Sequence, residues 1–249
     1  MNENDNIWWR IGTSGWNYKH WRGIFYPQNV PQSKWLEFYT EHFDTVELNA
    51  TFYRLPSRST FKRWYDRTPK DFLWSIKASK FITHTRRLKD CQEPLERLYE
   101  AIDPIREKLG AILFQLPPSL QFDPLVAEDF FRLLKRDFRY ALEARHKSWF
   151  QDQALKLMES HNIAFCISDT AGRYPYHEAI TADFLYIRLH GSRKLYASCY
   201  SEEEIVQWAG KLRRWKVSGF IYFDNDFEGY APKNALQLLE ASRYGAYDI

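Results

Sequence analysis

The sequence predicts an α/β fold, a TIM-like (β/α)8 barrel formed as a single domain by residues 1–249. Eight short, strand-like apolar runs alternate with helical segments, which is the rhythm of this barrel. The length agrees, because such barrels typically contain about 250 residues. An open doubly wound sheet is the main competitor. It usually carries a glycine-rich phosphate loop after its first strand, whereas residues 12–15 are too short for that motif and do not lead directly into a helix.

The predicted strands are apolar runs bounded by polar or turn-forming residues. In chain order they cover residues 7–11, 45–49, 73–77, 111–115, 140–145, 163–169, 184–190 and 219–225. Helices are expected over residues 33–42, 59–65, 94–109, 152–161, 201–215 and 232–242, and from residue 123 onward. Ser33 and Ser59 are the expected N-caps of the first two, and Gly110 is expected to end the third. No long helix is expected over residues 170–183, so the barrel is irregular between strands six and seven.

The fifth strand indicates where a site is expected. Tyr140, Ala141 and Leu142 are apolar, and a carboxylate and a guanidinium follow two residues apart, at Glu143 and Arg145. Side chains two residues apart in a strand point to the same face. A charge costs several kcal/mol to bury unless it is paired. The pair therefore belongs either to a functional site or to an exposed edge strand.

Other strands end in the same way, which favours a site at the mouth of the barrel, where the C-terminal ends of the strands meet. Central parallel strands are normally apolar on both faces, so repeated polar residues at one end are unusual. A self-compensating ion network is the alternative. The residues at these ends are Glu47, Asn49, Lys77, Gln115, Glu143, Arg145, Asp169, Arg188, His190 and Asn225.

The charges at the mouth indicate a type of ligand. Three carboxylates oppose three cations, and His190 is the only imidazole at a strand end. A divalent metal needs several carboxylates or imidazoles without competing cations, so we expect neither a metal nor another cofactor. Three cations suit a phosphate or carboxylate. The opposing groups are Glu47, Glu143 and Asp169 on one side and Lys77, Arg145 and Arg188 on the other.

Aromatic side chains in the loops of the mouth are further candidates for ligand contact. Trp16, Trp21 and Tyr196 could stack on a sugar or a base, or they could serve to pack the loops. Two hydrolase mechanisms find little support. A retaining glycosidase needs two carboxyl groups about 5 Å apart, and no sequence pattern fixes that distance. A Ser-His-Asp triad lacks its nucleophile elbow.

Composition excludes several other classes. The net charge is +3, with 35 basic and 32 acidic residues and no dense basic block, so a nucleic-acid partner is not expected. The three cysteines are far apart and show no zinc or disulfide spacing. The N-terminus has no signal-peptide pattern, and no run approaches the ~18 apolar residues needed to span a bilayer. The expected location is therefore the cytoplasm, without membrane contact.

Several motifs, spread over nearly the whole chain, resemble the YecE-like family, known as domain of unknown function 72. They lie at residues 12–16 with 21–27, 46–53, 77–78 with 83–84, 115–118, 143–145 with 148–149, 188–191, and 223–226 with 234–235. The resemblance implies a TIM-like barrel but no particular reaction. Asp224 and Asp226 flank Asn225 where other members often have neutral polar residues.

These observations favour an enzyme-like barrel that binds a small, polar, anionic ligand, such as a sugar phosphate or a nucleotide fragment. Arg145, Arg188 and Lys77 are expected to hold the anion, with Glu143 or Glu47 as acid or base and His190 as proton carrier. A non-catalytic binding or regulatory module is the alternative. A metal-dependent barrel of the nucleic-acid repair or sugar-isomerase type is weaker. The sequence does not predict the oligomeric state.

Overall fold

A computed structural model describes residues 7–244 and contains one eight-stranded parallel sheet that curves into a nearly closed barrel. The strands follow one another around the barrel in the order β1-β8-β7-β6-β5-β4-β3-β2, which confirms the predicted fold class. The strands are β1 (Trp9–Thr13), β2 (Thr45–Leu48), β3 (Leu73–Lys77), β4 (Leu109–Gln115), β5 (Tyr140–Glu143), β6 (Ile163–Asp169), β7 (Leu185–Leu189) and β8 (Gly219–Phe223).

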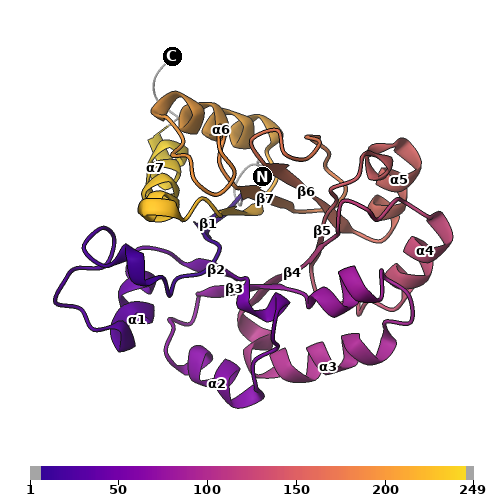
Figure 1. The fold of residues 1–249 in the computed structure, drawn as a ribbon, viewed down its shortest axis with the longest axis horizontal. Coiled ribbons are helices and arrows are strands. Elements are labelled where there is room, and N and C mark those ends of the chain that lie inside the picture. The colour runs from indigo at the N-terminus through magenta and orange to yellow at the C-terminus, as the bar shows by residue number, and fades with distance from the viewer. Residues whose placement is uncertain (1–6, 245–249) are drawn as a thin grey trace, which may run out of the picture.

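Helices surround the strands in chain order (Figure 1). They are α1 (Trp35–Thr40), α2 (Arg58–Asp66), α3 (Gln92–Ile102), α4 (Pro124–Arg132), α5 (Asp152–Ser160), α6 (Glu202–Trp215) and α7 (Tyr230–Tyr244). As predicted, the described residues between β6 and β7 form no helix. No helix within residues 7–244 combines the length and the apolar character that a membrane crossing requires.

Helix boundaries differ from the predicted ones at several places. Ser57, two residues before the predicted cap, begins α2 by accepting a hydrogen bond from Thr60 N. A 3-10 turn covers residues 32–34, where the start of the first helix was expected. Gly110 does not end a helix. It lies inside β4, where an added Cβ atom would come within 2.9 Å of the Phe220 ring, so glycine is needed there for packing.

Two apolar layers follow from the alternation of side chains along the strands. One set of residues packs outward against the helices, and the other fills the inside of the barrel. Aromatic side chains from β7 and β8 occupy the interior opposite alanines of β4, β5 and β6. The interior cluster consists of Ala111, Leu113, Ala141, Ala164, Cys166, Phe184, Tyr186, Phe220 and Tyr222.

The barrel closes between β1 and β2, where a single bridge joins Ser14 to Glu47. The buried Tyr39 hydroxyl, from α1, supplements this short contact. It accepts a hydrogen bond from Thr13 N at 3.1 Å and donates one to Thr45 O at 3.0 Å. One phenol thus serves two backbone groups that would otherwise lack partners at the seam.

Replacing Tyr39 with Phe should therefore lower the free energy of unfolding by about 1–3 kcal/mol, the usual cost of leaving buried polar groups unpaired. Urea denaturation would measure the loss. Tyr65→Phe is a matched control, because the Tyr65 hydroxyl bonds Glu107 at an exposed position. Equal stability of the two variants would contradict a role for Tyr39 in closing the barrel.

Candidate functional site

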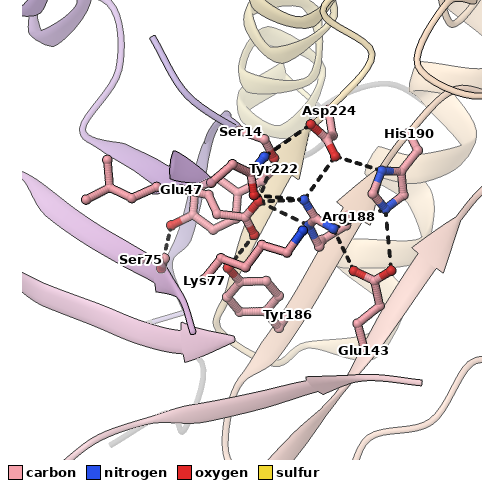
Figure 2. A network of polar contacts seen from close by, with 12 residues as sticks. Ser14, Glu47, Ser75, Lys77, Glu143, Tyr186, Arg188, His190, Tyr222 and Asp224 are labelled. Atoms are coloured by element: carbon pink, nitrogen blue, oxygen red, sulfur yellow. Dashed lines mark hydrogen bonds and ion pairs between the residues drawn. The ribbon is translucent and has the colours of Figure 1, made fainter. Parts of the chain in front are cut away.

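Arg188 lies at the centre of the polar network inside the C-terminal end of the barrel (Figure 2). It lies two residues after Tyr186 in β7, so its side chain points into the barrel like that of Tyr186. It is 0% exposed. Its guanidinium donates to Glu47 Oε1 from Nε at 3.1 Å and from Nη2 at 2.8 Å, to Glu143 Oε2 at 2.6 Å and to Asp224 Oδ2 at 2.9 Å. One buried cation thus joins carboxylates from β2, from β5 and from the segment after β8.

Glu47 is held from several sides. Besides Arg188, Ser14 donates to its Oε1 at 2.7 Å and the hydroxyl of Tyr186 donates to its Oε2 at 2.7 Å. Both carboxylate oxygens are engaged, and the residue is fully buried. Glu47 therefore serves mainly to anchor Arg188 and the seam between β1 and β2.

Glu143 is held in its ionised form. Burial would raise its pKa, but the opposing effect of Arg145, Arg188 and His190 is larger and holds that pKa well below its usual range. The pKa of Asp224 is lowered in the same way, since Arg188 and His190 outweigh the effect of burial. Carboxylates with such low pKa values are weak bases near neutral pH.

His190 follows β7 and bridges two of the carboxylates. Its Nδ1 lies 2.9 Å from Asp224 Oδ2, although the angle is not that of a regular hydrogen bond, and its Nε2 lies 3.9 Å from Glu143 Oε1. Tyr196 packs edge-on against the ring, with the centroids 5.4 Å apart. The imidazole is therefore enclosed between Asp224, Glu143 and the Tyr196 ring.

Arg145 and Lys77 differ from Arg188 because they keep unused donors. Within residues 7–244, Arg145 donates only from Nε, to Glu143 at 2.9 Å, and its guanidinium lies 4.4 Å from the centroid of the Tyr174 ring. The amine of Lys77 has no hydrogen-bond acceptor and no carboxylate within 4.0 Å among the described residues. It lies 4.4 Å from the centroid of the Phe52 ring. Burial, and then the charge of Arg188, lower the pKa of Lys77 to about 8.

Two of the residues expected at the mouth, Asp169 and Asn225, do not join the network. Asp169 accepts a hydrogen bond from the Tyr200 hydroxyl at 2.9 Å, and Asn225 donates to Ser198 O and to Asn234 Oδ1. The alternation of side chains along a strand is the reason. Each of the two lies an even number of residues from side chains that pack against the helices, so each is on the helix-facing side of its strand. The expectation that they converge with the other strand ends is therefore wrong.

The third carboxylate of the network is instead Asp224, which sequence reasoning did not select. It lies two residues after Tyr222, an interior residue, and this spacing is the signal that identifies its side. His84 was also missed. Its ring packs edge-on against Phe52 at 5.1 Å, and burial, followed by the charges of Arg145 and Lys77, lowers its pKa.

The remaining candidates lie around the network with differing exposure. Asn49 is 3.4 Å from both Arg188 Nη2 and Asp224 Oδ1, and Gln115 is buried beside Glu143 in the strand register. The two tryptophans pack against other parts of the chain. Trp21 is fully buried and donates to Asp226 O, and Trp16 meets Trp64 and Trp74 edge-on. Tyr196, at 39% exposed, remains available to a ligand.

The described part of the chain contains no group of three or more His, Cys, Asp or Glu side chains placed to hold a metal ion. The carboxylates that converge at the mouth are those bound to Arg188. What the arrangement offers chemically is therefore an amine, a guanidinium and the imidazole of His84 beside a buried ion network that includes His190.

Arg188→Met should destabilise the protein by about 3–5 kcal/mol, because three carboxylates at the mouth would lose their shared cation. Arg145→Met is the matched control and should cost less, since Glu143 keeps its bond to Arg188. Urea denaturation would compare them. A smaller loss for Arg188→Met than for Arg145→Met would show that the network does not depend on the central guanidinium.

Lys77→Met should stabilise the protein at pH 7. A pKa lowered from 10.5 to about 8 corresponds to on the order of 3 kcal/mol, which is an upper bound for the gain. The folded-state pKa is the lower one, so the unfolded chain binds more protons between about pH 8 and pH 10.5. The stability of the unmutated protein therefore rises with pH across this window, and the advantage of the variant shrinks.

Unfolding in urea at pH 7 and pH 9.5 would measure this difference. Lys108→Met is the matched control, because Lys108 is also buried but donates to Tyr65 O, Thr68 O and Thr68 Oγ1. That variant should lose stability at both pH values. A destabilised Lys77→Met variant with no dependence on pH would contradict the low pKa.

Comparison with known proteins agrees with this architecture. UPF0759 protein YunF of Bacillus subtilis is 27% identical over 92% of this chain and 93% of its own length, and YecE of Escherichia coli K12 is 26% identical over 82% and 81%.

Solved structures match as well. A crystal structure of a DUF72 family protein from Thermotoga maritima has a TM-score of 0.82 at 30% identity and covers 94% of this chain and 98% of that one. Another, from Enterococcus faecalis, has a TM-score of 0.82 at 21% identity, with 96% and 97% covered. The family model described as "Protein of unknown function DUF72" matches residues 10–246, and the chain therefore belongs to this family.

Proposed function

We propose that the protein binds a small anionic ligand, such as a sugar phosphate or a nucleotide fragment, at the mouth of the barrel and acts on it as an acid/base enzyme. One observation carries the proposal. Two cations at the mouth, Lys77 and Arg145, keep N–H donors that meet no acceptor among residues 7–244, whereas Arg188 is surrounded by carboxylates. A phosphate or carboxylate would satisfy the donors of both side chains.

Arg145 is suited to hold such a group. Its Nε is fixed to Glu143 and its plane lies against Tyr174, so the guanidinium is oriented before a ligand arrives. Both terminal nitrogens remain for a bidentate contact. Its side chain is 10% exposed, so it can be reached from the mouth. Arg188, which was expected to share this role, does not fit it, because its donors are already used inside the barrel.

Lys77 is the better acid or base. A proton-transfer group works best when its pKa is close to the working pH, and a pKa of about 8 meets this condition. Glu143 and Glu47, the expected acid or base, are committed to Arg188 and to other donors. In this proposal His190, which lies between Asp224 and Glu143, is the proton carrier.

A non-catalytic binding module is the second candidate, and one observation favours it. The carboxylates of the network have fixed partners, and the pKa values of Glu143 and Asp224 are lowered. Carboxylates that stay ionised and fixed in place suit a rigid binding surface as well as they suit an enzyme. Lys77 distinguishes the two classes. A binding module needs only the positive charge of Lys77, whereas an acid/base enzyme needs Lys77 to gain and lose a proton.

Inorganic phosphate, glucose 6-phosphate and citrate, each tested by thermal unfolding, should show whether the mouth binds anions. An anion at 100 times its dissociation constant should stabilise the protein by about 2.7 kcal/mol and raise Tm accordingly. Arg145→Gln should abolish the increase, because it removes the guanidinium fork.

Arg132→Gln is the control, since Arg132 is an exposed residue of α4 paired with Glu128. The proposal fails if no phosphate or carboxylate raises Tm, or if the increase survives in Arg145→Gln. Product analysis on each stabilising ligand then separates the classes. In an enzyme, Lys77→Met should lower turnover by about two to four powers of ten.

A further inference from the structure

Two buried lysines of this chain have opposite surroundings. Lys108, at 4% exposed, donates to two backbone carbonyls and a hydroxyl, at 2.7, 2.8 and 3.2 Å. Lys77, at 9% exposed, finds no acceptor within the described part of the chain. Burying an ammonium without partners is costly. Lys108 therefore has the surroundings of a structural cation, whereas Lys77 has those of an amine kept free.

Strand β3 and the residues packed beside it position the amine of Lys77. Lys77 is the last residue of β3, and its backbone carbonyl accepts a hydrogen bond from Thr51 Oγ1 at 2.6 Å. Thr51 belongs to the 3-10 turn Ala50–Phe52, which also supplies the ring beneath the amine. Figure 2 shows the Lys77 side chain extending toward the network around Arg188.

A proton carrier packs on the same ring. His84 lies edge-on to Phe52, and its Nδ1 is 2.9 Å from Thr83 Oγ1, which leaves Nε2 for other contacts. Because its pKa is lowered, the imidazole is mainly neutral near pH 7 and can accept or donate a proton. The amine of Lys77 and the imidazole of His84 are thus two neighbours of one phenyl ring.

We propose that Lys77 forms an imine with the carbonyl group of an aldehyde or ketone whose carboxylate or phosphate binds Arg145. This deepens the proposed function and rests on the same anion site. The free amine attacks the carbonyl carbon, and the nitrogen loses a proton while the oxygen gains one. The resulting hydroxyl takes a second proton and leaves as water, which gives a protonated C=N bond. His84 shuttles these protons.

The substrate class follows from the pairing of groups. A free amine is the nucleophile for a carbonyl carbon, and Arg145 selects an anionic substituent on the same molecule. With a pKa of about 8, roughly a quarter of Lys77 is unprotonated at pH 7.5, compared with about a thousandth for an ordinary lysine. Small 2-oxo acids and phosphorylated sugars in the open-chain form belong to this class.

Borohydride trapping tests the proposal on the full chain. Glyoxylate and pyruvate serve as probes, and sodium borohydride reduces any imine to a stable secondary amine that peptide mass spectrometry locates. We expect one adduct, on Lys77, at least tenfold above that on other lysines. Its rate of formation should rise with pH through about 8. Lys80→Met, which removes an exposed lysine nearby, should leave the adduct unchanged.

Lys77→Arg separates this inference from anion binding. It keeps the positive charge but removes the primary amine, so phosphate should still raise Tm while the adduct disappears. Labelling spread over surface lysines, or an adduct that survives in Lys77→Arg, overturns the proposal. Stabilisation by phosphate without an adduct on Lys77 overturns the imine but leaves the anion site intact. Loss of both signals overturns both.

Discussion

The burial of Arg188 is the constraint on which the upper half of the barrel depends. A guanidinium at 0% exposure is stable only if its N–H groups meet acceptors, and Glu47, Glu143 and Asp224 supply those acceptors. They come from β2, from β5 and from the segment after β8, so one side chain joins distant parts of the sheet. Glu47 also pairs with Ser14 at the seam between β1 and β2, where backbone bonding is sparse.

The mouth of the barrel was interpreted either as an ion network or as a ligand site, and each interpretation fits a different set of its residues. Arg188 and its carboxylates form the self-compensating network, because its donors are consumed inside the barrel. Arg145 and Lys77 do not fit that description. Formal charge at the mouth is balanced, but hydrogen-bonding capacity is not, and the unused donors belong to these two side chains. Hydrogen-bond partners, not net charge, therefore distinguish structure from function here.

Sequence alone predicted the strands and most inward-facing charges, because strand alternation and polar strand ends are local signals. Asp169 and Asn225 were misplaced because they end strands on the helix-facing side, and counting in twos from Tyr222 would have selected Asp224 instead. Gly110 looked like the end of a helix because its contact with Phe220 is formed only in the folded barrel. Nor could the sequence predict that the donor nitrogens of Arg188 are all engaged by carboxylates, since this depends on distances between β2, β5 and β8.

The ion network also affects the residue proposed to act. After burial, the charge of Arg188 is the largest influence that lowers the pKa of Lys77, while Glu143, Asp224 and Glu47 oppose it. Each carboxylate raises the pKa of the amine, and each is itself turned toward Arg188, which limits its ability to pair with Lys77. The cation that holds the strands together thus keeps the carboxylates occupied and the amine free. A neutral residue at position 188 would free three carboxylates to pair with Lys77, and the pKa of the amine would then rise.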